Sequence, residues 1–193
     1  MKHVKMLGLL VMAAASLMAF ASSASAAPTL TSPAGTEYTG EIHAVLEGTA
    51  LLKAGIEDTC TESTVKGTVT TNNETHAAGA LSVLTFGNCT KPDTEVLKAG
   101  SLTIKDDEVF AIGNEVRIKD TILGITCIYG GGASPGTKIG TLDDSTVTGK
   151  TATLTVNTSE LPRLPGSNET FCASKGTWTA NYSITTPDSL FIT

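Results

Sequence analysis

Apolar and polar residues alternate with a period of two in several segments, and this pattern constrains the fold more than any other feature of the sequence. The clearest case is TWTANYSITT at residues 177–186. Its apolar positions are Trp178, Ala180, Tyr182 and Ile184. Successive side chains of a β-strand point to opposite faces of a sheet, so this segment is predicted to be a strand with one buried face. Its tryptophan is therefore predicted to lie in the core.

Other segments carry the strand signal in different forms. Residues 38–47 and 152–156 also alternate, whereas residues 122–129 are apolar on both parities, which is typical of a central strand. Residues 101–105 and 115–119 are predicted to form a further pair of strands.

Turn-forming residues separate the strand-like segments about every eight to twelve residues, and no window shows an amphipathic helix. Many short strands at this spacing predict an all-β fold, either an antiparallel β-sandwich or a barrel-like form of it. The apolar run at 190–192 carries the pattern almost to the C-terminus. The tail is therefore predicted to be tied into a sheet.

The cysteines predict two disulfide bonds. They are Cys60, Cys89, Cys127 and Cys172. An even number of cysteines in an exported chain is typical of a disulfide framework, and four cysteines allow three connectivities. No CxxC motif is present, and neither His43 nor His76 adjoins a cysteine in sequence. No metal site and no cofactor are therefore predicted.

One connectivity explains the pattern around the first cysteine. The segments TCTESTVKGTVTT and AGALSVLTFGNC both read as strands. If Cys60 stands opposite Cys89 in an antiparallel ladder, Val65 faces Leu84. The same ladder pairs Val69 with Ala80 and Ser63 with Phe86.

This register also predicts which side chains share a face. The two cysteines lie on the face opposite Val65, together with Leu81 and Val83. A single register thus satisfies both the valines and the cysteines. The predicted disulfides are Cys60–Cys89 and Cys127–Cys172.

The N-terminus has the three-part pattern of a secretory signal peptide at residues 1–26. Basic residues open the chain, the apolar stretch MLGLLVMAAASLMAFA follows, and the small residues Ala24 and Ala26 precede the expected cleavage point. The apolar stretch is short for a transmembrane helix, which is the alternative. Cleavage after Ala26 leaves residues 27–193 as a single all-β domain, secreted from the cell and without a membrane span.

The secreted domain is acidic. Removing Lys2 and Lys5 takes two positive charges from the net charge of −6 and leaves −8. A chain with this balance and no basic cluster is not expected to bind nucleic acid or an anionic membrane.

Acidic turns provide the only candidate catalytic groups. Asp106 and Asp107 precede Glu108, and Asp143 adjoins Asp144. A glycosidase needs two carboxylates across a cleft, and a calcium site needs six to eight oxygen ligands. The sequence fixes neither geometry. No GxSxG motif is present, so a serine hydrolase is not predicted.

Several segments resemble a loose group of small, uncharacterised secreted proteins of actinobacteria. They are TCTESTVKGTV, ALSVLTFGNC, GITCIYGGG and GTWTANYSITTPDSLFIT. The resemblance covers most of the mature chain and implies an exported all-β protein from such a host, but no activity. Neocarzinostatin-like apoproteins are similar in class only, because their cysteine spacing differs.

Together these observations predict a secreted, non-enzymatic envelope or extracellular protein with a structural or binding role. Its ligand and its extracellular or cell-envelope partner are not identified by the sequence. The alternative is a secreted hydrolase that uses the turn carboxylates Asp106, Asp107, Asp143 and Asp144. Two of these acids converging in one cleft would favour the enzyme, whereas scattered acids would favour the binding role.

Overall fold

The computed structural model describes residues 29–91, 93–145 and 151–193, so the segment predicted to be a signal peptide lies outside the described residues. The strands are β1 (Leu30–Thr31), β2 (Glu41–Lys53), β3 (Glu57–Asn72), β4 (Ala77–Cys89), β5 (Asp93–Lys98), β6 (Ser101–Lys105), β7 (Glu108–Ile112), β8 (Glu115–Asp120), β9 (Ile125–Gly130), β10 (Thr137–Asp143), β11 (Thr153–Pro162), β12 (Lys175–Thr186) and β13 (Phe191–Ile192). Among the described residues, no helix is long and apolar enough to cross a membrane.

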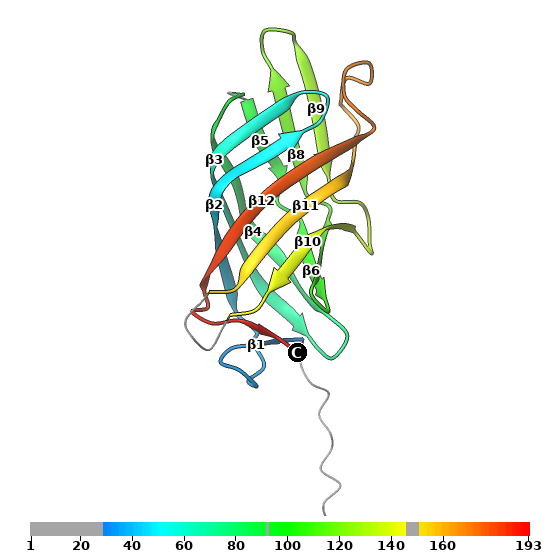
Figure 1. Cartoon of the computed structure of the whole chain (residues 1–193). Coiled ribbons are helices and arrows are strands. Elements are labelled where there is room, and N and C mark those ends of the chain that lie inside the picture. The colour runs from blue at the N-terminus through cyan, green and yellow to red at the C-terminus, as the bar shows by residue number, and fades with distance from the viewer. Residues whose placement is uncertain (1–28, 92, 146–150) are drawn as a thin grey trace, which may run out of the picture.

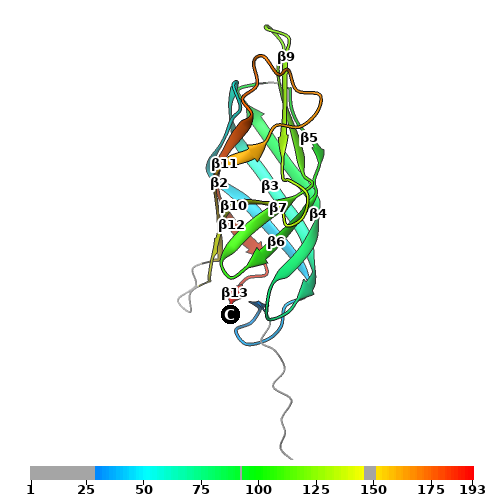
Figure 2. The same cartoon turned by 90° about the vertical axis from the view of Figure 1, so that its right-hand side faces the viewer.

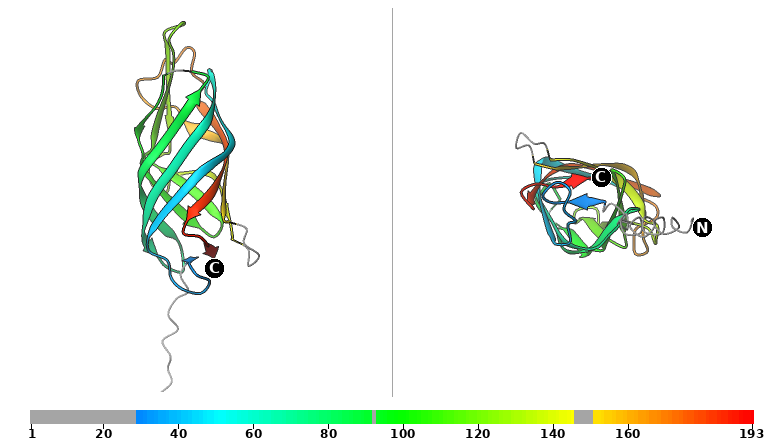
Figure 3. Two further views of the ribbon diagram at one scale, coloured as in Figure 1. Left: turned by 90° about the vertical axis from the view of Figure 1, so that its left-hand side faces the viewer. Right: turned by 90° about the horizontal axis from the view of Figure 1, so that it is seen from below.

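Eight of the strands form a closed antiparallel barrel, in the order β10-β11-β12-β2-β3-β4-β6-β7 (Figures 1 and 3). Around this ring the strands keep their order along the chain, which leaves the barrel at β5 and again at β8 and β9, and the pairing of β12 with β2 closes the ring. The predicted all-β fold with two disulfides is confirmed, and it takes the barrel form.

Two smaller sheets complete the molecule. Strands β5, β8 and β9 form a three-stranded sheet at one end, which we call the upper end because it lies at the top of Figure 1. Strands β1 and β13 pair at the opposite, lower end, where they lie across the end of the barrel (Figures 2 and 3). The C-terminal tail is thus tied into a sheet, as predicted.

The β3–β4 ladder confirms the predicted cysteine register. Cys60 pairs with Cys89, Val65 with Leu84, and the two disulfides are Cys60–Cys89 and Cys127–Cys172. Val69, however, pairs with Gly79 and not with Ala80, because a β-bulge shifts the register by one residue between Lys66 and Gly67. A second bulge further along β3 restores the original register.

The predicted faces of this ribbon are also wrong in part. Leu81, predicted to lie opposite the valines, pairs with Gly67 and lines the same interior space as Val65. Cys60 is 0% exposed and belongs to the core together with Val65. Two consecutive exposed residues, Thr61 and Glu62, interrupt the alternation between them. Strict period-two counting therefore fails across this stretch.

Two other strand predictions are wrong in part. Residues 101–105 form β6, but they pair with β7 in a hairpin and not with residues 115–119, which form most of β8. The predicted central strand at 122–129 begins only at Ile125, and Ile122 is 92% exposed in the preceding turn. Apolar residues on both faces of a strand are buried only where other parts of the protein cover both faces. The side chains of Ile122 and Leu123 have no such cover in this turn.

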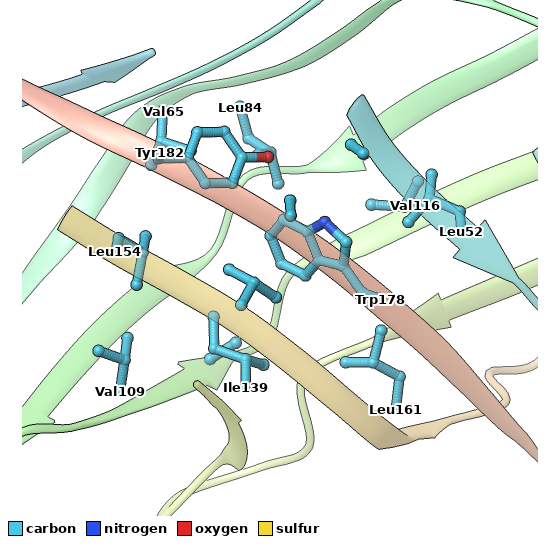
Figure 4. Packing of buried hydrophobic residues seen from close by; sticks show 14 of the residues in the cluster. Leu52, Val65, Leu84, Val109, Val116, Ile139, Leu154, Leu161, Trp178 and Tyr182 are labelled. Atoms are coloured by element: carbon cyan, nitrogen blue, oxygen red, sulfur yellow. The ribbon is translucent and has the colours of Figure 1, made fainter. Parts of the chain in front are cut away.

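The predicted buried face of residues 177–186 is confirmed. Trp178, Ala180, Tyr182 and Ile184 are 4%, 3%, 0% and 3% exposed. The ring of Trp178 meets Phe86 and Tyr182 edge to face, with centroid distances of 5.8 and 6.4 Å. These three rings form an aromatic layer across the middle of the interior, and Figure 4 shows Trp178 and Tyr182 within it.

Trp178→Ala should therefore destabilise the fold strongly. Removing a fully buried tryptophan typically costs about 3–5 kcal/mol of unfolding free energy. Urea unfolding followed by circular dichroism would measure the loss. Leu123→Ala, at a position that is 67% exposed, is the matched control and should change stability by less than about 0.5 kcal/mol. Equal stability of Trp178→Ala and the native protein would contradict the core assignment.

Candidate functional site

The lower half of the barrel contains an apolar cavity of about 60 Å³ that is partly open to solvent. Strands β2, β3, β4, β6, β7, β10, β11 and β12 all contribute side chains to its wall. Buried members of the wall include Val65, Ala77, Val109, Leu154, Ile184 and Leu190. None of the described residues that line the cavity is titratable, so the space is suited to apolar molecules and offers no acid or base.

Small residues on β3 and β4 create this cavity. Gly67, Ala77 and Gly79 are among the lining residues, and none of them has a side chain larger than a methyl group. The glycines are required by close strand packing: a Cβ on Gly79 would lie 2.1 Å from the Thr68 carbonyl oxygen. The bulged β3–β4 ladder thus brings two backbones together and leaves the interior beside them unfilled.

One side of the cavity wall is only partly buried. Ile42, Leu81, Leu102 and Ile104 line the cavity and keep intermediate exposure to solvent. They lie on strands β2, β4 and β6. An apolar guest could therefore reach the cavity between partly exposed apolar side chains.

The sheet of β1 and β13 covers the lower end of the cavity. Asn72 fastens the N-terminal strand of this cover: its side chain accepts a hydrogen bond from Leu30 N and donates to the carbonyl oxygens of Leu30 and Tyr38. On the C-terminal side, Leu190 N donates to Ser145 Oγ at 2.9 Å, and Leu190 itself lines the cavity. The segment that leads into β13 is therefore part of the cavity wall.

The aromatic layer, none of whose three residues lines this cavity, carries a short polar chain. The hydroxyl groups of Tyr182 and Ser63 are hydrogen-bonded at 2.9 Å, and Ser63 donates to the Thr85 carbonyl oxygen. Burial raises the pKa of Tyr182 to about 12, and the bond to Ser63 opposes this rise in part. Trp178 Nε1 also lowers the pKa of Tyr182 slightly, but it lies outside hydrogen-bonding geometry and has no partner among the described residues.

A second, smaller cavity of about 20 Å³ lies above this layer. Its wall combines Leu52 and Trp178 from the barrel with Val116, Ile118 and Tyr129 from the upper sheet. The Tyr129 hydroxyl lies within hydrogen-bonding distance of the carbonyl oxygens of Ala54 and Ala173 and can donate its one hydrogen to either. This space can hold about one water molecule and is too small for an organic ligand.

A buried carboxylate lies beside the first disulfide. Asp58 is 0% exposed and accepts hydrogen bonds from Lys91 N and from the hydroxyl groups of Thr90 and Thr94. Together with Cys60 and Cys89 it is the one group of acids, histidines and cysteines that lies close enough for metal binding in the described part of the chain. Because both sulfurs are bonded to each other, they cannot act as thiolate ligands. Asp58 instead fixes the connection to β5.

The acids predicted as catalytic candidates lie together but outside the cavity. The β7–β10 ladder places the Asp107 carbonyl oxygen 2.8 Å from Leu142 N, so the Asp106–Asp107 turn adjoins the end of β10 at Asp143. All of these carboxylates are exposed. Asp144 accepts a hydrogen bond from Ile192 N and so holds the tail. None of the four lines either cavity.

The sequence pattern predicted some of the apolar side chains of the wall, but it did not predict that they line a cavity. The alternation placed Val65, Val69 and Leu84 on one apolar face, and the structure puts the two valines in the wall. The available signal was the run of small residues on the facing strand, Ala77 to Ala80. The two histidines, His43 and His76, do not line the cavity.

The chain matches no family model, no curated protein and no solved structure. The candidate site is therefore described from its own residues alone.

Stability should fall at alkaline pH through Tyr182. Its pKa is near 10 in an unfolded chain and about 12 in the fold, so the folded protein keeps a proton that the unfolded chain releases. The stabilisation is complete below about pH 10 and is lost as the pH rises toward 12, by on the order of 2–3 kcal/mol. Urea unfolding between pH 8 and pH 11.5 would measure this loss.

Tyr182→Phe should remove that part of the alkaline loss. Tyr38→Phe is the matched control, because the Tyr38 side chain is only partly buried and its hydroxyl should contribute less to the alkaline loss of stability. An unchanged pH dependence in Tyr182→Phe would show that the hydroxyl titrates normally and is not enclosed.

Proposed function

We propose that this protein is an exported, non-enzymatic binding protein that holds a small apolar molecule, or the apolar end of an amphiphile, in the lower cavity. The observation that carries the proposal is a cavity of about 60 Å³ whose wall contains no titratable side chain. Eight-stranded barrels have an interior that is either filled by side chains or able to hold one small ligand. Here the small residues of β3 and β4 leave part of it unfilled.

Apolar chemistry follows from the cavity wall. Water in such a space would find almost no hydrogen-bond partners, so apolar cavities of proteins stay dry and accept hydrophobic guests. A guest gains dispersion contacts with side chains that otherwise face an empty volume. The partly exposed residues Ile42, Leu102 and Ile104 offer it a route from solvent.

Export is supported by the two disulfides and by the sequence pattern of residues 1–26. Disulfides persist in oxidising compartments and are rare in the cytosol. The partner is then an extracellular or envelope molecule. The hydrolase alternative has no support in the cavity, because the four turn carboxylates lie outside it.

Binding should raise the melting temperature. A ligand that binds only the folded state stabilises it by RT ln(1 + [L]/Kd), and about 1 kcal/mol corresponds to roughly 2–4 °C in a domain of this size. Linear alcohols from butanol to decanol are the probe, measured by differential scanning calorimetry. The shift should grow with chain length and stop growing when the chain exceeds the cavity.

Ala77→Leu should fill the cavity and abolish the ligand-induced shift. Ala77 is 1% exposed and lies in the wall, so the added carbons enter the space that the ligand would occupy. Ala77→Val is the milder variant if leucine overpacks the site. Ser82→Leu, at an exposed position on the same strand, is the matched control and should keep the shift. Identical shifts in all variants, or none in the native protein, would contradict the proposal.

A further inference from the structure

Large apolar side chains are exposed on two adjoining segments at the upper end of the molecule. Ile122 and Leu123, in the turn between β8 and β9, are 92% and 67% exposed. Phe171, in the loop between β11 and β12, is 58% exposed. Both segments lie at the top of Figures 1 and 2. The loop is joined to β9 next to the turn, since Asn168 N and Cys172 Sγ both contact the Thr126 carbonyl oxygen.

The β8–β9 turn is held in shape by polar contacts beneath its apolar side chains. Asp120 Oδ1 accepts hydrogen bonds from both Ile122 N and Leu123 N, each at 3.0 Å. Lys91 Nζ lies 2.7 Å from Asp120 Oδ2. The hydrogen bond from Lys91, followed by that from Leu123 N, holds the pKa of Asp120 below its ordinary value. The turn therefore presents two apolar side chains whose own amide groups are already satisfied.

The charges nearest the turn are paired with one another. Lys91 pairs with Asp120, and Lys119 pairs with Asp93 at 3.6 Å. The charges of these two pairs cancel, whereas the whole chain has a net charge of −6. An acidic protein with a neutral apolar tip is repelled by anionic lipid and is not steered to a charged partner.

We propose that Ile122 and Leu123 insert into the surface of a zwitterionic lipid layer and dock the protein there reversibly. Backbone polar groups that enter hydrocarbon need hydrogen-bond partners, and the Asp120 carboxylate already accepts hydrogen bonds from the N–H groups of Ile122 and Leu123. A convex two-residue tip offers far less area than the roughly 800 Å² per partner of a stable protein interface. At a lipid surface, by contrast, each apolar side chain gains binding free energy from its own burial alone. Phe171 provides a further exposed apolar side chain on the adjoining loop.

Sedimentation with sucrose-loaded phosphatidylcholine vesicles tests the proposal on the oxidised protein. The native protein should bind, equally well in 0.1 M and 1 M NaCl, and should bind less when phosphatidylglycerol is added. The double variant I122S/L123S should lose at least about tenfold in vesicle affinity. The matched control V45S/L97S removes two apolar side chains that are 39% and 38% exposed on β2 and β5, and it should bind as the native protein does.

Three outcomes would overturn the proposal. The first is no binding of the native protein to phosphatidylcholine vesicles. The second is equal binding by I122S/L123S and the native protein. The third is self-association, seen by analytical ultracentrifugation without vesicles and abolished by I122S/L123S, which would assign the tip to a second copy of the chain. None of these outcomes bears on the cavity, because Ile122 and Leu123 do not line it.

Discussion

Because β12 hydrogen-bonds to β2 and β7 to β10, the barrel has no free strand edge, and every inward side chain shares one enclosed volume. The radius of such a ring is set by its strands and not by the side chains within it. Large inward residues therefore fill the interior, and small ones leave it open. The upper part holds Trp178, Tyr182 and Phe86, whereas the lower part has Gly67, Ala77 and Gly79 in its wall.

The unfilled volume has a modest energetic cost that the rest of the fold can offset. At about 24 cal/mol per Å³, a cavity of 60 Å³ corresponds to about 1.5 kcal/mol. Each disulfide, closing sequence separations of 29 and 45 residues, contributes about 3.5–4 kcal/mol in the chain-entropy description. Both bridges lie toward the upper end, with Cys127 in the three-stranded sheet. None of the four cysteines lines the cavity, so its wall contains no cross-link.

Alternation in the sequence predicted which side chains are buried more reliably than which strands are neighbours. The face of Trp178, Tyr182 and Ile184 and the pairing of Cys60 with Cys89 followed from local spacing, because one wrong register would have moved whole faces to the surface. Strand neighbours depend on long connections. Between β7 and β10 the chain leaves the barrel to form β8 and β9, and no local pattern marks that departure.

The cavity and the exposed tip escaped prediction for related reasons. A cavity depends on the summed volumes of side chains from eight strands, so Ala77 and Gly79 become informative only when the strands opposite them are known. The exposure of the tip depends on how the surrounding elements are placed. Ile122 belongs to an apolar run that predicts burial, but it is exposed because the β8–β9 turn extends past the upper sheet.

These two apolar features lie in different halves of the molecule, one inside the barrel and one outside it. The aromatic layer of Phe86, Trp178 and Tyr182 lies between them, and no described residue belongs to both. Substitutions at well-separated sites without shared partners usually have additive effects. The two proposed properties, an apolar guest in the lower half and an apolar contact at the upper end, are therefore each set by a few residues of their own.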